Sequence, residues 1–227
     1  TNANRIDRTQ RCERLEGCDR LAQCCVVSRV SAAGNCAIIV QVTRWIAIGE
    51  EERQVLVAII KTAINPALAL LPAVMDTPEA RVMLLAIGLQ ESRFTYRYQL
   101  VQGKPGAKGP ARGFWQFELG SRATRGGVWG VYLHQASRYW LSVACAARGV
   151  AFDPRAIWEA IEQDDVLAAA LARLLLFTDS RRLPAVNDAQ GAWDLYALRT
   201  WRPGKPHRQT WDAFHAQARA AVAGSQQ

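Results

Sequence analysis

An apolar helix over residues 77–92 limits what this chain can fold into more than any other segment does. Thr77 is a good N-cap, and Pro78 suits the first helical position, where its missing N–H leaves nothing unsatisfied. Apolar residues then recur at helical spacing until the segment reaches a lone carboxylate, Glu91. The pattern predicts a buried helix that ends near Ser92 and carries one acidic side chain at its C-terminal end.

The surroundings expected for Glu91 favour a catalytic role. Leu84, Ile87 and Gly88 lie seven, four and three residues before it, so all three share its face of the helix. Apolar surroundings raise the pKa of a carboxyl group, as a general acid near neutral pH requires. The alternative is an exposed Glu91 that pairs with a neighbouring arginine. Gly88 costs the helix roughly 1 kcal/mol relative to alanine, which predicts a close approach by backbone or substrate.

The rest of the chain has helical spacing and almost no strand signal. There is no convincing hairpin signal and no alternation of strands with helices, so the expected fold class is all-α, with at most a minor irregular β element over 94–100. Residues 103–113 are glycine-rich and are predicted to be a loop. Asn65–Pro66 is expected to end a first helix, and residues 166–177 are so apolar that they are expected to form the central one.

Composition divides the chain into two parts. Residues 1–49 contain five of the six cysteines at irregular gaps, and their apolar residues follow no clear period, so their structure and chemistry are left open. The gaps fit neither paired C-x-x-C spacing for zinc nor a compact disulfide framework, and no metal or cofactor is expected. Residues 50–227 hold the organised helical pattern and are predicted to form the functional domain. We expect no signal peptide and no transmembrane segment.

The net charge of +8 suits an anionic partner, such as nucleic acid, an acidic membrane surface or a cell wall that bears carboxylates and phosphates. Lysine and arginine are spread along the sequence, so solubility alone is an equally good explanation. The sequence has no nucleic-acid-binding motif, so a nucleic-acid binder ranks last among the functions considered. The sequence also has no H-E-x-x-H, G-x-S-x-G or Cys–His arrangement that would indicate a metalloprotease, serine hydrolase or amidase.

Two short motifs carry a family resemblance. Glu91–Ser92 is followed by R-F, and G-P-A-R-G-F-W-Q-F-E then covers residues 109–118. An E-S pair at the end of a buried helix, with a G-x-x-Q segment about twenty to thirty residues later, resembles the soluble lytic transglycosylase and goose-type lysozyme group. The resemblance implies a lysozyme-like helical domain over 50–227. It also implies that Glu91 is the catalytic acid, that Ser92 positions the acid or the substrate, and that Gln116 lies in the substrate groove.

Further groove residues are expected beside these motifs. Trp115 and Trp201 stand next to loops, and aromatic side chains in such positions can line sugar subsites. Glu118 is the carboxylate to test as a second catalytic group. The family's Y-N-A-G segment has its nearest equivalent in T-W-R-P-G over 200–204, where Trp201 replaces the tyrosine and Arg202 the asparagine.

The resemblance implies cleavage of peptidoglycan between N-acetylmuramic acid and N-acetylglucosamine, with glycan strands as the partner. A lytic transglycosylase is favoured because no second acid stands in a recognisable motif. A hydrolytic lysozyme (muramidase) on the same bond is one alternative. A non-catalytic cell-wall-binding or virion structural domain is another, to which the changed Trp201–Arg202 segment points. The resemblance extends to versions that phages and prophages encode, which implies action from a virion or from the host cytoplasm, as an endolysin does.

Overall fold

The computed structural model describes residues 49–104, 106–202 and 207–225, which all belong to one compact unit. The predictions for residues 1–48 and for 203–204 lie outside the described residues. Helices dominate, and one two-stranded sheet accompanies them, which confirms the all-α class with a minor β element. The elements in chain order are a helix over 49–59, η1 (Ile60–Ile64), α3 (Asn65–Ala69), η2 (Ala73–Met75), α4 (Pro78–Ser92), β1 (Tyr98–Leu100), β2 (Lys108–Arg112), α5 (Gly127–Leu133), α6 (Gln135–Ala147), α7 (Pro154–Ala160), α8 (Asp165–Leu176), α9 (Ala189–Asp194), η3 (Leu195–Thr200) and α10 (Arg208–Gly224).

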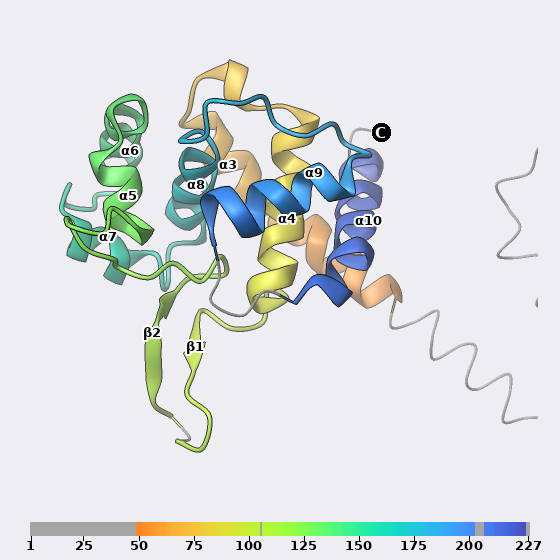
Figure 1. Cartoon of the computed structure of the whole chain (residues 1–227), viewed down its shortest axis with the longest axis horizontal. Helices are drawn as coiled ribbons and strands as arrows, with labels where there is room; N and C mark the ends of the chain where they lie inside the picture. Colours follow the sequence, from red (N-terminus) through yellow and green to blue (C-terminus); the bar gives the residue numbers. More distant parts are fainter. Residues whose placement is uncertain (1–48, 105, 203–206, 226–227) are drawn as a thin grey trace, which may run out of the picture. The chain divides into compact units, whose positions relative to one another are not determined.

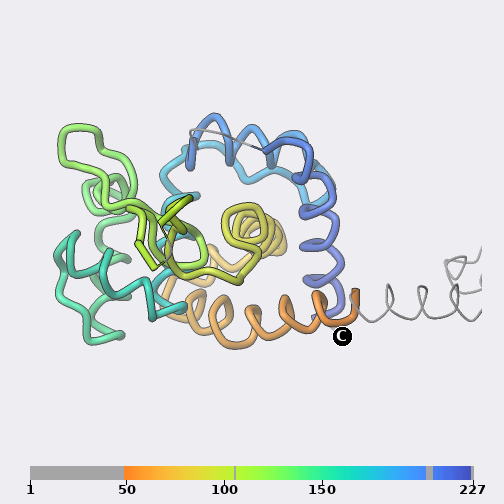
Figure 2. Tube along the Cα trace, turned by 90° about the horizontal axis from the view of Figure 1, so that it is seen from below, coloured from red at the N-terminus to blue at the C-terminus, as the bar shows by residue number. Residues whose placement is uncertain are grey.

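Helix α4 lies at the centre of the fold (Figure 1). The Thr77 Oγ1 accepts a hydrogen bond from the Ala80 N–H at 3.2 Å, and Pro78 is the first helical residue, so both predicted start signals are confirmed. Every residue over 82–89 is buried, so this part of the helix has no solvent face. Seen along its axis, α4 is enclosed by the first helical segment, α9 and α10 (Figure 2).

The apolar segment expected to form the central helix, residues 166–177, belongs to α8. This helix is buried, as predicted, and it packs against η1, α3, α4, α5, α6 and η3. Helices α4 and α8 are thus both inner helices of the fold and contact each other, as an apolar surface on all sides predicts.

The first helix does not end at Asn65–Pro66, as the sequence led us to expect. Residues 49–59 continue directly into the π-helical turn η1 and then into α3. Pro66 occupies one of the first two positions of α3, just past η1. A π turn changes the hydrogen-bond register, so a residue without an N–H can follow it without breaking the helical path.

Strands β1 and β2 form an antiparallel hairpin that extends away from the helices (Figure 1). Tyr98 pairs with Arg112, and Leu100 pairs with Lys108. The glycine-rich segment predicted as a loop therefore contains a strand. Local composition could not show this, because β2 exists through its pairing with β1.

Ion pairs hold the base of the hairpin against the helices. Arg97 Nη2 lies 2.6 Å from Asp165 Oδ2, at the start of α8. Arg112 Nε lies 2.9 Å from Glu162 Oε2, and Lys108 pairs with the same carboxylate. These contacts fix the hairpin against the start of α8 and the segment just before it.

Two negative findings apply to the part of the chain that the structure describes. No helix there is long and apolar enough to cross a membrane. No group of three or more His, Cys, Asp or Glu side chains there is placed to hold a metal ion.

Candidate active site

Glu91 lies in the last turn of α4, one residue before the helix ends. The helix ends because Arg93 adopts a left-handed conformation, with φ 52°, and its N–H bonds the Leu89 carbonyl at 3.1 Å. Ile87 and Gly88, which share the face of Glu91, are buried. The predicted apolar face is therefore confirmed, while the Glu91 side chain itself stays partly exposed.

The side chain of Phe94 explains the glycine at position 88. A Cβ atom built on Gly88 would lie 2.2 Å from the Phe94 ring, so a larger residue there would force the ring to move. The same ring packs edge-on against Phe114 and Trp115, with centroid distances of 5.6 and 5.8 Å. The close approach predicted at Gly88 therefore comes from an aromatic side chain, and the expectation of backbone or substrate is wrong.

Ser92 joins the two motifs that the sequence placed about twenty residues apart. Its hydroxyl donates to the Phe114 carbonyl at 2.7 Å and accepts the Phe94 N–H at 3.1 Å. The side chain is buried and does not line the groove described below. Ser92 can therefore position the turn after Glu91, while its side chain does not line the groove.

Tyr196 is the polar partner of Glu91. Its hydroxyl donates to Glu91 Oε1 at 2.8 Å, across 105 residues of sequence. Burial raises the pKa of Glu91 to about 7, and the hydrogen bond from Tyr196 only partly opposes this rise. Burial and the nearby Glu91 carboxylate also raise the pKa of Tyr196, so its hydroxyl stays a neutral donor. The pair is thus a carboxyl group that titrates near neutral pH and a phenol that fixes one of its oxygens.

Glu91 opens into a groove with a volume of about 790 Å³. The groove runs along the hairpin, the start of α5 and the end of η3. Residues from all three regions and from the motif segment line it, namely Glu91, Gln99, Ala111, Gln116, Phe117, Glu118, Gly120, Thr124, Gly126, Gly127, Leu175, Thr200, Trp201 and Arg202. The structure therefore brings together five of the seven predicted site residues, and leaves out Ser92 and Trp115.

The prediction that Trp115 lines the groove is wrong. Its side chain is fully buried, and its indole N–H donates to the Leu84 carbonyl at 2.8 Å. Trp115 therefore packs behind Glu91, against α4. Trp201 does line the groove, and its indole N–H donates to the Trp115 carbonyl at 3.1 Å, with the ring packed against Phe117.

Backbone strain gathers around the groove. Among the described residues, five that are not glycine have positive φ angles, and four of them, Arg93, Phe94, Gln116 and Arg202, either line the groove or directly follow Glu91–Ser92. Each such conformation costs on the order of 1–2 kcal/mol for a residue with a Cβ atom. Residues held in this way are concentrated at functional sites, where the surrounding structure maintains a conformation that the chain would not adopt alone.

Gln116 and Arg202 show how this conformation is maintained. The Gln116 side-chain amide donates to the Gly113 carbonyl at 2.8 Å and to the Tyr96 carbonyl at 3.3 Å, which ties the motif segment to the start of the hairpin. The Arg202 backbone N–H donates to the Tyr196 carbonyl at 3.2 Å. The chain at Arg202 is thus hydrogen-bonded to Tyr196, whose hydroxyl donates to Glu91.

Glu118 supplies a second carboxylate to the same groove. Its side chain is exposed, in contrast to that of Glu91. Two carboxyl groups in different surroundings are the usual means by which a glycosidase separates its acid from its base or nucleophile. The groove therefore holds two carboxyl groups in different surroundings, Glu91 largely covered and Glu118 exposed.

The sequence patterns did not single out Tyr196. The residue is buried, and its ring stacks on Trp211 with a centroid distance of 5.0 Å, so its periodicity indicates only a core residue. A usable signal was its polar tip, because the hydroxyl of a buried tyrosine needs a partner. The π-helical turn η3 also marks this region, since such turns are frequent at functional sites.

No protein-family model, curated protein or solved structure matches the chain. The chemistry of the groove is therefore inferred from its own residues and from the motifs in the sequence.

Proposed function

We propose that this chain is a lytic transglycosylase that cleaves peptidoglycan between N-acetylmuramic acid and N-acetylglucosamine, with Glu91 as its one catalytic carboxyl group. The observation that carries the proposal is the pKa and position of Glu91. Burial raises the pKa of this carboxyl group to about 7, and the side chain lines an open groove. Such a group is protonated often enough near neutral pH to act as an acid, and afterwards it is basic enough to accept a proton.

In the proposed reaction Glu91 acts first as an acid and then as a base. Glu91 gives its proton to the glycosidic oxygen while the bond from that oxygen to the muramoyl C1 breaks, and positive charge develops at C1 and the ring oxygen. The Glu91 carboxylate then accepts the proton of the muramoyl 6-hydroxyl, whose oxygen bonds to C1. No water is consumed, and Glu91 is protonated again. In both steps Tyr196 occupies Oε1, so Oε2 is the oxygen that exchanges the proton.

The other groove residues suit a glycan that carries peptides and carboxylates. Trp201 is partly exposed and offers an aromatic surface whose orientation is fixed by its indole hydrogen bond. Arg202 adds an exposed cation at the same end of the groove. Gln116 lines the same groove, with its side-chain amide bonded to the Tyr96 and Gly113 carbonyls.

A hydrolytic lysozyme acting on the same bond is the second candidate, and Glu118 is the observation that favours it. An exposed carboxylate in the same groove could activate a water molecule or stabilise the positive charge at C1. In the transglycosylase reaction Glu118 has no step. Removal of its charge therefore separates the two mechanisms.

The experiment uses the purified full chain with peptidoglycan, and mass spectrometry identifies the released muropeptides. The wild type is expected to release 1,6-anhydro products, and Glu91→Gln is expected to lower the rate by about 10²–10⁴-fold. Release at the wild-type rate by the folded Glu91→Gln protein would contradict the proposal.

Glu118→Gln is the matched control, because it makes the same substitution in the same groove. A transglycosylase would keep its rate within about tenfold in this variant and would retain its anhydro products. Products without the anhydro ring, together with a loss in Glu118→Gln as large as that in Glu91→Gln, would assign the hydrolase instead. Circular dichroism and thermal unfolding show that each variant is folded.

A further inference from the structure

A second cavity contains a buried arginine whose charge is not neutralised. Arg173, near the end of α8, has a side chain that is only 5% exposed. Its Nε donates to the Met75 carbonyl at 2.8 Å, while its Nη1 is buried and has no hydrogen-bond partner among the described residues. Burial lowers the pKa of Arg173 to about 10, so the guanidinium still carries its charge at neutral pH. A buried charge without a counter-ion is costly, and few are found in proteins.

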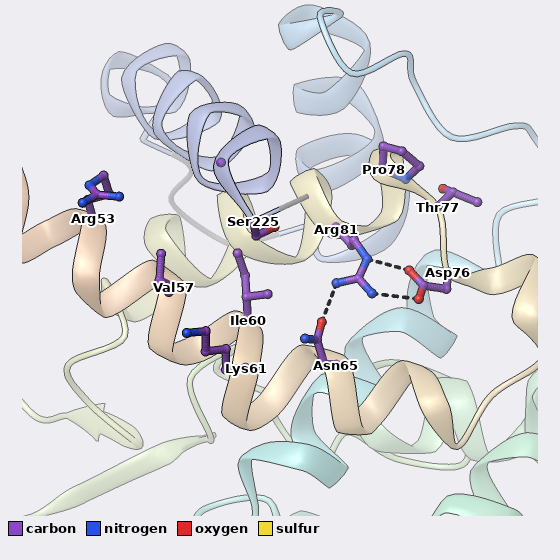
Figure 3. A pocket seen from close by; sticks show the side chains of 11 residues that line it. Arg53, Val57, Ile60, Lys61, Asn65, Asp76, Thr77, Pro78, Arg81 and Ser225 are labelled. Carbon is purple, nitrogen blue, oxygen red and sulfur yellow. Dashed lines mark hydrogen bonds and ion pairs between the residues drawn. The ribbon is translucent and has the colours of Figure 1, made fainter. Parts of the chain in front are cut away.

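Arg81 shows what a satisfied arginine looks like in the same part of the molecule. Its Nε and Nη2 donate to the two Asp76 carboxylate oxygens at 2.6 and 2.7 Å, and its Nη1 donates to Asn65 Oδ1 at 2.6 Å (Figure 3). The cavity of about 650 Å³ that these residues line therefore contains a cation with its anion already in place. Asp76 is also the carboxylate that acts on Arg173 through space, but both of its oxygens are bonded to Arg81.

Arg173 lines a different cavity, with a volume of about 930 Å³. Much of the lining is apolar, and two of its side chains are unusually exposed for their type: Val74 at 80% and Phe177 at 38%. The Arg173 Cζ lies 6.0 Å from the centre of the Phe177 ring. An apolar wall and a buried cation side by side suit a ligand that has an apolar body and an anionic end.

The charges around this cavity select the kind of anion. Arg181 and Arg182 also line it, which gives three guanidinium groups with Arg173, against the carboxylates of Glu79 and Asp179. Asp179 is already paired, with Arg199 at 2.7 Å and Arg181 at 3.4 Å. The balance attracts one negative charge, while the two carboxylates disfavour a dianion such as phosphate.

We propose that this cavity binds a monocarboxylate with a short aliphatic body, and that the Arg173 guanidinium holds its carboxylate. A planar guanidinium and a carboxylate match each other in geometry, and such pairs are about twice as strong as hydrogen bonds between neutral groups. The carboxylate can come from the C-terminus of a peptide with small aliphatic side chains or from a free aliphatic acid. The proposal does not depend on the chemistry of Glu91, which lies at the other end of α4.

The test compares ligands with and without the charge on the wild-type chain. Isothermal calorimetry measures the binding of acetyl-alanyl-alanine, of the same peptide with an amidated C-terminus, of hexanoate and of inorganic phosphate. At least one of the two acids is expected to bind, and the amidated peptide is expected to bind at least about tenfold more weakly than the acid peptide. The stronger of the two acids identifies the source of the carboxylate. Absence of binding by both acids up to about 10 mM, equal binding of the amidated peptide, or tighter binding of phosphate would overturn the proposal.

Two variants locate the binding. Arg173→Met removes the charge and keeps a side chain of similar length, and it is expected to weaken the binding of the acid by at least about tenfold. Arg155→Met is the matched control, because Arg155 is 67% exposed on α7 and lies no closer than 3.7 Å to its partner Glu159. Unchanged affinity in a folded Arg173→Met protein would overturn the assignment. Should that variant fail to fold, the comparison of acid and amide on the wild type still decides the outcome.

Discussion

Glu91 and Asp179 are two carboxyl groups that burial affects in the same direction and neighbours affect differently. Burial favours the neutral form of both and so pushes both pKa values upward. Glu91 receives one hydrogen bond from a neutral phenol, and its pKa ends at about 7. At Asp179 the Arg181 backbone N–H and the Arg199 and Arg181 guanidinium groups outweigh burial, and the pKa is lowered. A backbone hydrogen bond and two cations, rather than the degree of burial, decide which carboxyl group stays ionised.

This difference in pKa suits Glu91 to proton transfer and Asp179 to a structural ion pair. A carboxylate that ion pairs keep ionised holds the 177–182 segment against η3, and it has no proton to give at neutral pH. A carboxyl group with only a tyrosine beside it exchanges its proton near pH 7, at a cost in stability that the rest of the fold must offset.

The largest effect on stability is expected from Glu91→Gln. The folded state holds the Glu91 proton up to about pH 7, whereas the unfolded chain releases it near 4.5, so the wild type loses stability as the pH rises between these values. The variant cannot ionise, so its advantage is zero below pH 4.5 and reaches about 3 kcal/mol above pH 7. Urea unfolding of both proteins across this range measures the difference. If the stability advantage of Glu91→Gln over the wild type did not grow with pH, the pKa of Glu91 would not be raised in the folded protein.

Asp179→Asn is expected to change the free energy of unfolding in the opposite direction, toward lower stability, and by a smaller amount. The lowered pKa of Asp179 contributes stability above the unfolded value of 3.8, and this contribution is lost as the pH falls through the folded value. Removal of the charge leaves Arg199 without its counter-ion, so at pH 7 the variant is expected to lose about 2 kcal/mol. The deficit is expected to shrink below pH 3.8 in the same urea measurements.

Asp212→Asn serves as the control for Asp179. Asp212 pairs with Arg208 at 2.8 Å, but its side chain is 66% exposed. Exposed ion pairs contribute between about 0 and 1 kcal/mol, so this variant is expected to unfold close to the wild type. Equal losses in the two variants would mean that burial around Asp179 adds nothing to its ion pairs.

Tyr196→Phe is expected to have a small effect on stability and an informative effect on activity. The ring keeps its stacking on Trp211, while the hydrogen bond that lowers the pKa of Glu91 is lost. Stability is expected to fall by about 1 kcal/mol. The alkaline limb of kcat/KM, which reports the loss of the Glu91 proton, is expected to move to higher pH. A limb that stayed in place or moved to lower pH would show that Tyr196 does not tune Glu91.

Local patterns predicted what local interactions produce. The start of α4 at Thr77–Pro78 and the apolar face before Glu91 were read correctly because capping and helical spacing act within a few residues. β2 and the continuation through Pro66 were missed, because one depends on a partner strand and the other on a change of helical register. Trp115 was misplaced because the sequence shows that a tryptophan adjoins a loop but not which way it points.

The sequence by itself determined that Glu91 ends an apolar helix and that Gly88 leaves room beside it. The resemblance, rather than the pattern, gave Glu91 a chemical role. Only the tertiary structure decided that Tyr196 reaches Glu91, that Ser92 joins the two motifs, and that a groove with Glu118 and Trp201 lies in front of them. The physical reason is range: helix spacing and capping are set by neighbours within one or two turns. A raised pKa depends on every atom that excludes water, and those atoms come from segments up to 105 residues away.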